Sequence, residues 1–107
     1  MFENLSSILP VDRLYETPRL VAFHHPKPVY PIHILIAPKK AVKNISQLVE
    51  TGSEFAPYFM GDLLNCVCKL VEDFALERAG YRLIVNGGSY QDVPELHFHL
   101  LSGEIKD

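Results

Sequence analysis

The sequence predicts an α+β fold: one antiparallel β-sheet of about five strands, a long helix packed on it, and a short helical segment at the N-terminus. Three observations predict this fold: short β-type runs between turn signals, one long run with helical periodicity, and a globular composition. The 107 residues are 48% hydrophobic and 21% charged, which is typical of a folded chain rather than a disordered one. This length predicts a single domain over residues 1–107.

The first half of the chain contains three predicted strands. Residues 1–10 precede them and predict only a short helical segment. Residues 13–24 have β-type side chains on both sides of a Thr-Pro turn, which predicts two short antiparallel strands. Three prolines in residues 26–31 exclude a central strand and predict a shaped loop. The apolar run at residues 33–37 then predicts a strand that is covered on both faces.

A long amphipathic helix is predicted after residue 51. Thr51 and Glu54 have the spacing of a capping box, in which side chains satisfy the first amide groups of a helix. The apolar residues that follow recur every three or four positions: Phe55, Phe59, Leu63, Val67, Leu70 and Phe74. Pro57 lies near the start, where a missing amide proton costs least, and Gly80 provides the stop.

Two more strands are predicted at residues 81–85 and 96–101, separated by a turn that begins at residue 86. Alternate side chains of a strand point to opposite faces. Glu95, His97 and His99 therefore share one face, at positions about 6–7 Å apart along the strand. The apolar side chains between them point toward the helix. Taken alone, this polar face is equally typical of solvated surface.

Charge and targeting signals narrow the classes of function. Ten Lys and Arg against 13 Asp and Glu give a net charge of −3, which argues against a protein that binds extended nucleic acid. No apolar run approaches the roughly 20 residues that span a bilayer, and residues 1–4 lack the basic flank of a signal peptide. We therefore expect no membrane partner, a cytoplasmic location and a small-molecule ligand.

The two cysteines, Cys66 and Cys68, lie within the predicted helix. Residues two apart on a helix point in different directions, so a disulfide between them is not expected. We interpret both as ordinary helix residues.

The histidines gather near strand ends. His33 opens a predicted strand, and His24 and His25 close the strand before it. His97 and His99 lie on the polar face of the last strand. Imidazole can act as a nucleophile, a proton carrier or a metal ligand near neutral pH, so convergence of these rings would make a reactive site.

Several motifs, in order along the chain, resemble the histidine triad (HIT) family of nucleotide hydrolases and transferases. The matching segments are Leu9-Pro10, residues 13–16 and 19–23, the run PIHILIAPKK at 31–40, YRLIVN at 81–86, and residues 91–101 with ELHFHLL. Their order and spacing cover nearly the whole chain. The resemblance implies the HIT-like fold, no cofactor, and a homodimer that pairs through the long helix and the neighbouring strand.

The resemblance also implies a role for each matched residue. His97 occupies the position of the nucleophile, which attacks the α-phosphorus of a nucleotide derivative and forms a covalent nucleotidyl-histidine. His99 and His33 match the phosphate-binding histidines, so the implied catalytic residues are His97, His99 and His33. Asn86 and Gln91 match residues of the phosphate loop. The positions that match the base pocket are Leu9, Phe23, His24, His25 and Pro26.

Three positions depart from the family pattern. Glu95 replaces the first histidine of the triad, although its main-chain carbonyl can still orient the nucleophile. His25 stands at the position of an aspartate that binds ribose, and Asp92 stands where one branch has serine. These departures leave open a nucleotide- or phosphate-binding module with weakened catalysis. A metal site is a further alternative, because His33, His97, His99 and Glu95 are all competent metal ligands.

Overall fold

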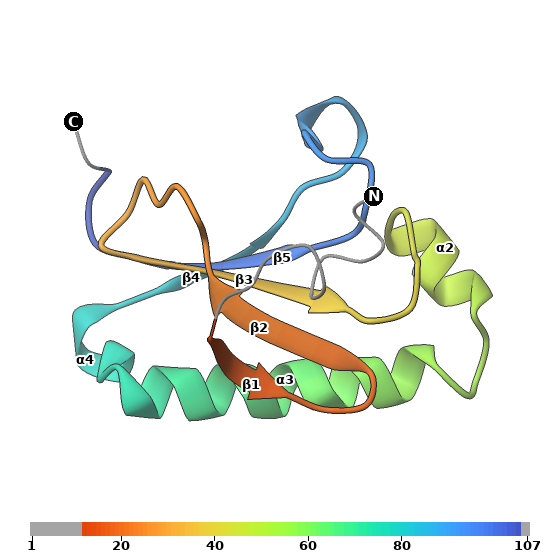
Figure 1. Cartoon of the computed structure of the whole chain (residues 1–107), viewed down its shortest axis with the longest axis horizontal. Coiled ribbons are helices and arrows are strands. Elements are labelled where there is room, and N and C mark those ends of the chain that lie inside the picture. The colour runs from red at the N-terminus through yellow and green to blue at the C-terminus, as the bar shows by residue number, and fades with distance from the viewer. Residues whose placement is uncertain (1–11, 106–107) are drawn as a thin grey trace.

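Five antiparallel strands form the sheet in the computed structural model, which describes residues 12–105 (Figure 1). The strands are β1 (Arg13–Glu16), β2 (Leu20–His24), β3 (Ile32–Pro38), β4 (Arg82–Val85) and β5 (Phe98–Ser102). Their order across the sheet is β1-β2-β3-β5-β4, so β5 lies between β3 and β4. The predicted α+β fold is confirmed for the described residues. The short helical segment predicted at residues 1–10 lies outside them.

The sheet has an apolar cluster on each face, because side chains alternate along the central strands. The larger cluster joins the sheet to the helices and includes Leu20, Ala22, Ile34, Ile36, Phe98 and Leu100 with Phe59, Leu63 and Leu70. The smaller cluster consists of Val21, Phe23, Leu35 and Ala37. The apolar run of β3 is therefore buried on both faces, as its sequence predicts.

The long helix α3 (Ala56–Asp73) runs along one face of the sheet (Figure 1). Its buried residues include Phe59, Leu63 and Leu70, which confirms the predicted amphipathic face. Among the described residues, no helix is long and apolar enough to cross a membrane.

The helix ends earlier than its periodicity predicts. Ala75 adopts the left-handed conformation with φ +54°, and a separate short helix, α4 (Leu76–Ala79), follows. The break brings Leu76 into the core, where it is buried. Gly80 closes α4 with φ +93°, so the predicted glycine stop is confirmed for this second helix.

The predicted capping box at residues 51–54 is wrong, because Thr51 belongs to the end of another helix. This helix, α2 (Ile45–Glu50), begins at Asn44, whose side chain accepts a hydrogen bond from Gln47 N–H at 2.9 Å. The Thr51 hydroxyl donates to the Leu48 carbonyl at 2.6 Å. Helix α3 begins after Phe55 with no side-chain cap and with a proline in its first turn.

The last strand begins at Phe98 rather than at Leu96. Leu96 N–H instead donates to the Val42 carbonyl at 2.9 Å, which ties the approach to β5 to the segment after β3. A single turn of 3-10 helix, η2 (Gly88–Tyr90), lies between β4 and this approach. Figure 1 shows the loop before β3 and the loop after β4 rising on the side of the sheet opposite α3.

Candidate active site

Four imidazole rings meet on the sheet face opposite α3. His25 follows β2, His33 lies in β3, and His97 and His99 lie just before and within β5. The ring centroids are 4.3 Å apart for His25 and His33, 5.5 Å for His33 and His99, and 4.9 Å for His97 and His99. In the β3–β5 register His33 faces Leu101 and Leu35 faces His99, so the two histidines are diagonal neighbours. The predicted convergence is confirmed for these four rings.

A hydrogen bond to the backbone fixes the orientation of His97. Its Nδ1 lies 2.8 Å from the carbonyl oxygen of Glu95, two residues before it. A carbonyl can only accept, so Nδ1 carries the proton and the lone pair of the neutral ring is on Nε2. His97 is 9% exposed and its ring meets His99 edge to face. The expected carbonyl contact of Glu95 is therefore present.

A chain of hydrogen bonds also fixes the tautomers of His33 and His99. Val29 N–H donates to Nδ1 of His33 at 3.2 Å, so neutral His33 carries its proton on Nε2. Nε2 of His33 lies 3.3 Å from Nδ1 of His99, which must then accept. Neutral His99 consequently carries its own proton on Nε2, where it can donate to an anionic oxygen.

The environment of the cluster favours uncharged rings. Burial, then the charges of His97, His33 and His25, lowers the pKa of His99 to about 4. Burial, followed by the nearby His25, also lowers the pKa of His33. These rings are therefore neutral near neutral pH and act as hydrogen-bond donors rather than as fixed cations.

A cavity of about 240 Å³ opens beside two of these histidines. It is lined by Tyr30, His33, Ile84, Asn86, His99 and Leu101. His97 is not among the described residues that line this cavity. It precedes His99 along the chain, whereas Leu101, which lines the cavity, follows it. Asn86 follows β4 directly and lines the same cavity as His33 and His99.

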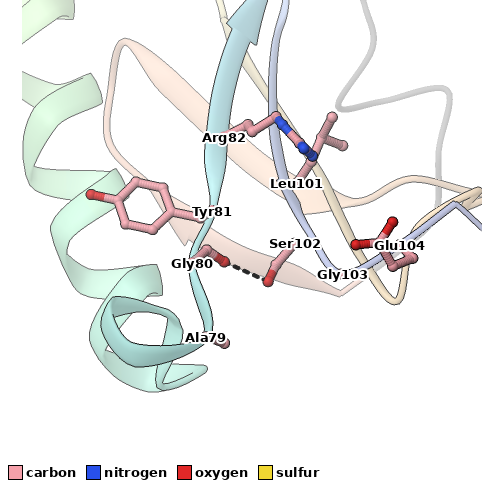
Figure 2. Close-up of a pocket in the computed structure, with 8 residues that line it drawn as sticks. All are labelled: Ala79, Gly80, Tyr81, Arg82, Leu101, Ser102, Gly103 and Glu104. Carbon is pink, nitrogen blue, oxygen red and sulfur yellow. Dashed lines mark hydrogen bonds between the residues drawn. The ribbon is translucent and has the colours of Figure 1, made fainter.

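A second cavity, of about 230 Å³, shares one lining residue, Leu101, with the first. Figure 2 shows it at the start of β4, with Arg82 extending across β5 toward Leu101 and with Glu104 after the end of β5. The Ser102 hydroxyl donates to the Gly80 carbonyl at 2.7 Å, which connects the end of β5 to the segment before β4 (Figure 2). This cavity holds none of the predicted site residues.

The predicted loop residues are placed around the cluster rather than in it. The Gln91 side chain donates to the carbonyl oxygens of Lys43 and Val93, at 2.7 Å and 3.0 Å, and so connects two loops. Asp92 is exposed, but its charge acts on His99 and partly offsets the lowering of that pKa. Glu95 contributes its carbonyl oxygen to His97.

The positions that match the base pocket lie in different places, as far as residues 12–105 show. Phe23 is fully buried in the small apolar cluster, and Pro26 is exposed in the loop before β3. His24 points to the other face of the sheet, where its ring meets Phe74 at 5.9 Å, because successive residues of β2 alternate. Its placement therefore does not support a role in the pocket. Leu9 lies outside the described residues, and only His25 joins the rings.

The geometry does not favour the metal alternative. Within residues 12–105, no three side chains of His, Cys, Asp or Glu are arranged to hold a metal ion. His33 Nε2 instead faces His99 Nδ1, and His97 Nδ1 faces a carbonyl. These nitrogens form hydrogen bonds with each other and with the backbone.

The sequence interpretation missed Tyr30 and Ile84, which line the cavity with the histidines. Tyr30 lies in the proline-rich loop and meets His33 edge to face at 5.7 Å. Ile84 lies opposite His99 in the β4–β5 register, which only the strand pairing reveals. The only sequence signal for Tyr30 was that it is an aromatic residue three positions before His33.

The fold and the four rings define a class of protein: an α+β domain in which histidine rings with fixed orientations cluster beside a small cavity on one face of an antiparallel sheet. The HIT domain family matches residues 7–105 of the chain. A protein of Buchnera aphidicola subsp. Baizongia pistaciae named "Uncharacterized HIT-like protein" is 31% identical over 102 residues, which are 94% of this chain and 88% of that protein. The chain therefore belongs to the HIT domain family.

Solved structures give the same result for the fold. A HIT family hydrolase from Legionella pneumophila Philadelphia 1 has a TM-score of 0.80 and 29% identity, and the match covers 97% of this chain and 92% of that one. A histidine triad nucleotide-binding protein from Candida albicans has a TM-score of 0.76 and 26% identity, with 98% and 73% covered. The predicted HIT-like α+β fold is confirmed by these similarities.

Proposed function

We propose that the protein is a hydrolase that acts at the α-phosphate of a nucleotide derivative, with His97 as the nucleophile. The observation that carries this proposal is the 2.8 Å contact between Nδ1 of His97 and the Glu95 carbonyl. It holds the proton on Nδ1 and leaves the lone pair on Nε2, the nitrogen that attacks. The likeness to a HIT family hydrolase and to a nucleotide-binding histidine triad protein supports the reaction class and the ligand.

The reaction has two steps at phosphorus. Nε2 of His97 forms a bond to the α-phosphorus, and the bond from phosphorus to the leaving amine or phosphate breaks. The leaving group takes the electron pair of that bond and a proton from solvent, and the water of the second step returns one proton to solvent. Water then attacks the same phosphorus, the bond to His97 breaks, and a nucleoside monophosphate is released.

The other residues of the cluster serve the phosphoryl oxygens in this proposal. The hydrogen bonds from Val29 to His33 and from His33 to His99 leave an N–H donor on Nε2 of His99. Nε2–H of His33 maintains that tautomer by donating to Nδ1 of His99. A donor fixed in advance stabilises charge that develops in the transition state. Asn86 adds an amide to the wall of the same cavity. Gln91 shapes the loop that follows Asn86 rather than the reacting atoms.

Glu95 at the first triad position favours a second candidate, a nucleotide-binding module with weak turnover. Its carboxylate adds a negative charge two residues from the nucleophile, and a like charge disfavours the binding of phosphate. Its carbonyl still orients His97, which favours the enzyme. The trapping of an intermediate separates the two candidates.

The test is mass spectrometry of the intact protein after a rapid acid-free quench with adenosine 5′-phosphoramidate or an adenylylated amine. We expect an added adenylyl mass on the wild type, mapped to His97 by peptide fragmentation, and no added mass on His97→Gln. Release of adenosine monophosphate should be lost in the same variant. Binding without any adduct would favour the binding module, and equal release by both proteins would exclude His97 as the nucleophile.

We also propose that two copies of the chain pair through α3 and β4. Apolar side chains remain exposed on both elements: Tyr58, Met60 and Leu64 on α3, and Leu83 and Val85 on β4. Strand β4 is an edge strand of the sheet and, within residues 12–105, pairs only with β5. A second copy would cover this apolar surface and the strand edge together.

A further inference from the structure

His25 is the one imidazole of the cluster that the proposed reaction does not use. Its ring lies against His33 with centroids 4.3 Å apart and an interplanar angle of 34°. Its backbone N–H donates to the His33 carbonyl at 2.8 Å, which extends the β2–β3 pairing by one residue. His25 is therefore held at a defined place beside the catalytic rings rather than on a loose loop.

The neutral ring of His25 offers a ligand a donor and no acceptor. Lys27 N–H donates to Nδ1 of His25 at 2.9 Å, so the neutral ring carries its proton on Nε2. Nδ1 is thereby occupied, and the ring cannot accept hydrogen bonds from the two hydroxyls of a sugar diol. Its natural partner is an acceptor, above all an anionic oxygen.

His25 also shares the electrostatic field of the reacting rings. The charge of His97 acts on His25, and the charge of His25 acts on both His33 and His99. A proton on any of these rings raises the cost of a proton on the others. A ligand that brings negative charge to the His25 end of the cluster lowers the cost of such a proton.

We propose that His25 is a specificity-determining residue that selects nucleotides with a second anionic group on the sugar, such as a 3′-phosphate, over nucleotides with an unmodified diol. Nε2–H of His25 donates to an oxygen of that second group, while the α-phosphate meets His97 and His99. This inference rests on the proposed function, because it concerns the ligand of the same site.

Aspartate and asparagine at position 25 give a matched pair of variants. Both side chains have an oxygen that can accept Lys27 N–H two residues on, as in an Asx turn, so both can keep the loop contact. His25→Asn keeps an N–H donor, whereas His25→Asp offers only acceptors and a negative charge. Asn65→Asp places the same charge on exposed α3, on the other side of the sheet, and controls for net charge.

The measurement is calorimetric Kd for adenosine 5′-monophosphate and adenosine 3′,5′-bisphosphate with each protein. We expect wild type and Asn65→Asp to bind the bisphosphate roughly tenfold more tightly or better. His25→Asn should keep part of this preference, and His25→Asp should reverse it.

Equal affinities in the wild type, or a preference that survives in His25→Asp, would overturn the inference and leave the proposed function standing. If neither nucleotide binds the wild type, the proposed function falls and this inference falls with it.

Discussion

Nε2 of His33 lies 3.3 Å from Nδ1 of His99, and Val29 N–H decides that His33 is the donor of this pair. The contact needs one proton between the two nitrogens, so a second proton on His99, at Nδ1, would break it, and a second proton on His33 would break the contact from Val29 N–H instead. Burial, then the charges of His97, His33 and His25, lowers the pKa of His99 to about 4, so this ring is neutral near neutral pH. The folded structure therefore determines which nitrogen of His33 and of His99 carries the proton.

The first prediction concerns acid stability. In the unfolded chain His99 titrates near 6.5, whereas in the folded protein its pKa is about 4. Between these values the unfolded state binds more protons, so folding stability falls as the pH falls through this window. We expect His99 to cost the wild type roughly 1–3 kcal/mol of unfolding free energy over that range, after allowance for its partial exposure.

Urea unfolding of the wild type and of His99→Gln across this pH range measures the effect. Glutamine does not titrate, so the free-energy gap between the two proteins should shift in favour of the variant as the solution becomes acidic. A gap that stays constant with pH would show that His99 titrates normally in the folded protein.

The second prediction concerns Gly103, which follows β5 with φ +89°. A Cβ atom there would lie 2.7 Å from Cγ of Pro31, two residues before His33. Glycine avoids both the strained conformation and the clash. We expect Gly103→Ala to lower the unfolding free energy by about 1–3 kcal/mol, measured by urea or thermal unfolding.

Gly87→Ala provides the control for that change. Gly87 has φ −137°, and its added Cβ would meet nothing within 4 Å. We expect its unfolding free energy to stay within about 0.5 kcal/mol of the wild type. If both variants lose stability equally, the packing of Gly103 on Pro31 has no special importance.

The sequence predicted those elements of the fold whose apolar residues form one clear local pattern. The strand at residues 33–37 was predicted from its continuous apolar run, and the apolar face of α3 from its helical period. Helix α2 was missed because six residues are too short to show a period. The break at Ala75 was missed because apolar spacing continues across it, and only burial of Leu76 against the sheet explains it.

Local sequence patterns also predicted part of the candidate site, whereas the rest depends on tertiary structure. His97 and His99 were predicted by alternation along one strand, and His33 and His25 by their places at strand ends. The opposite placements of His24 and His25 depend on where β2 ends, since one residue changes the face. The tautomer chain through Val29 depends on the path of the proline-rich loop, which composition does not determine.

The third prediction separates the carbonyl of Glu95 from its carboxylate. Glu95→Gln keeps the carbonyl that accepts from His97 Nδ1, so we expect adduct formation on His97 to persist. Loss of the negative charge should tighten the binding of adenosine 5′-monophosphate by roughly two- to tenfold. Rapid-quench mass spectrometry and calorimetry measure the two effects.

Asp92→Asn is the comparison variant for Glu95→Gln. Asp92 is exposed and also carries a negative charge toward His99, so its removal should change affinity less because water screens it. Loss of the adduct in Glu95→Gln would contradict the assignment of orientation to the backbone alone.

The fourth prediction concerns the apolar surface of α3 and β4. Leu64 is 59% exposed on α3, beyond what the single sheet face covers, and Leu83 and Val85 are exposed on the edge strand. A charge at the centre of such a surface must be desolvated when a second copy covers it, which opposes pairing. We expect the wild type to sediment as a dimer at micromolar concentration and Leu64→Glu to sediment as a monomer.

Val49→Glu makes the prediction specific to that surface. Val49 is 68% exposed on α2, an element at the other end of the sheet, so the same substitution there should leave the dimer intact. Both variants place a new carboxylate at an exposed apolar position, and neither position is in the folded core. A monomeric wild type, or dissociation by both variants alike, would exclude pairing through α3 and β4.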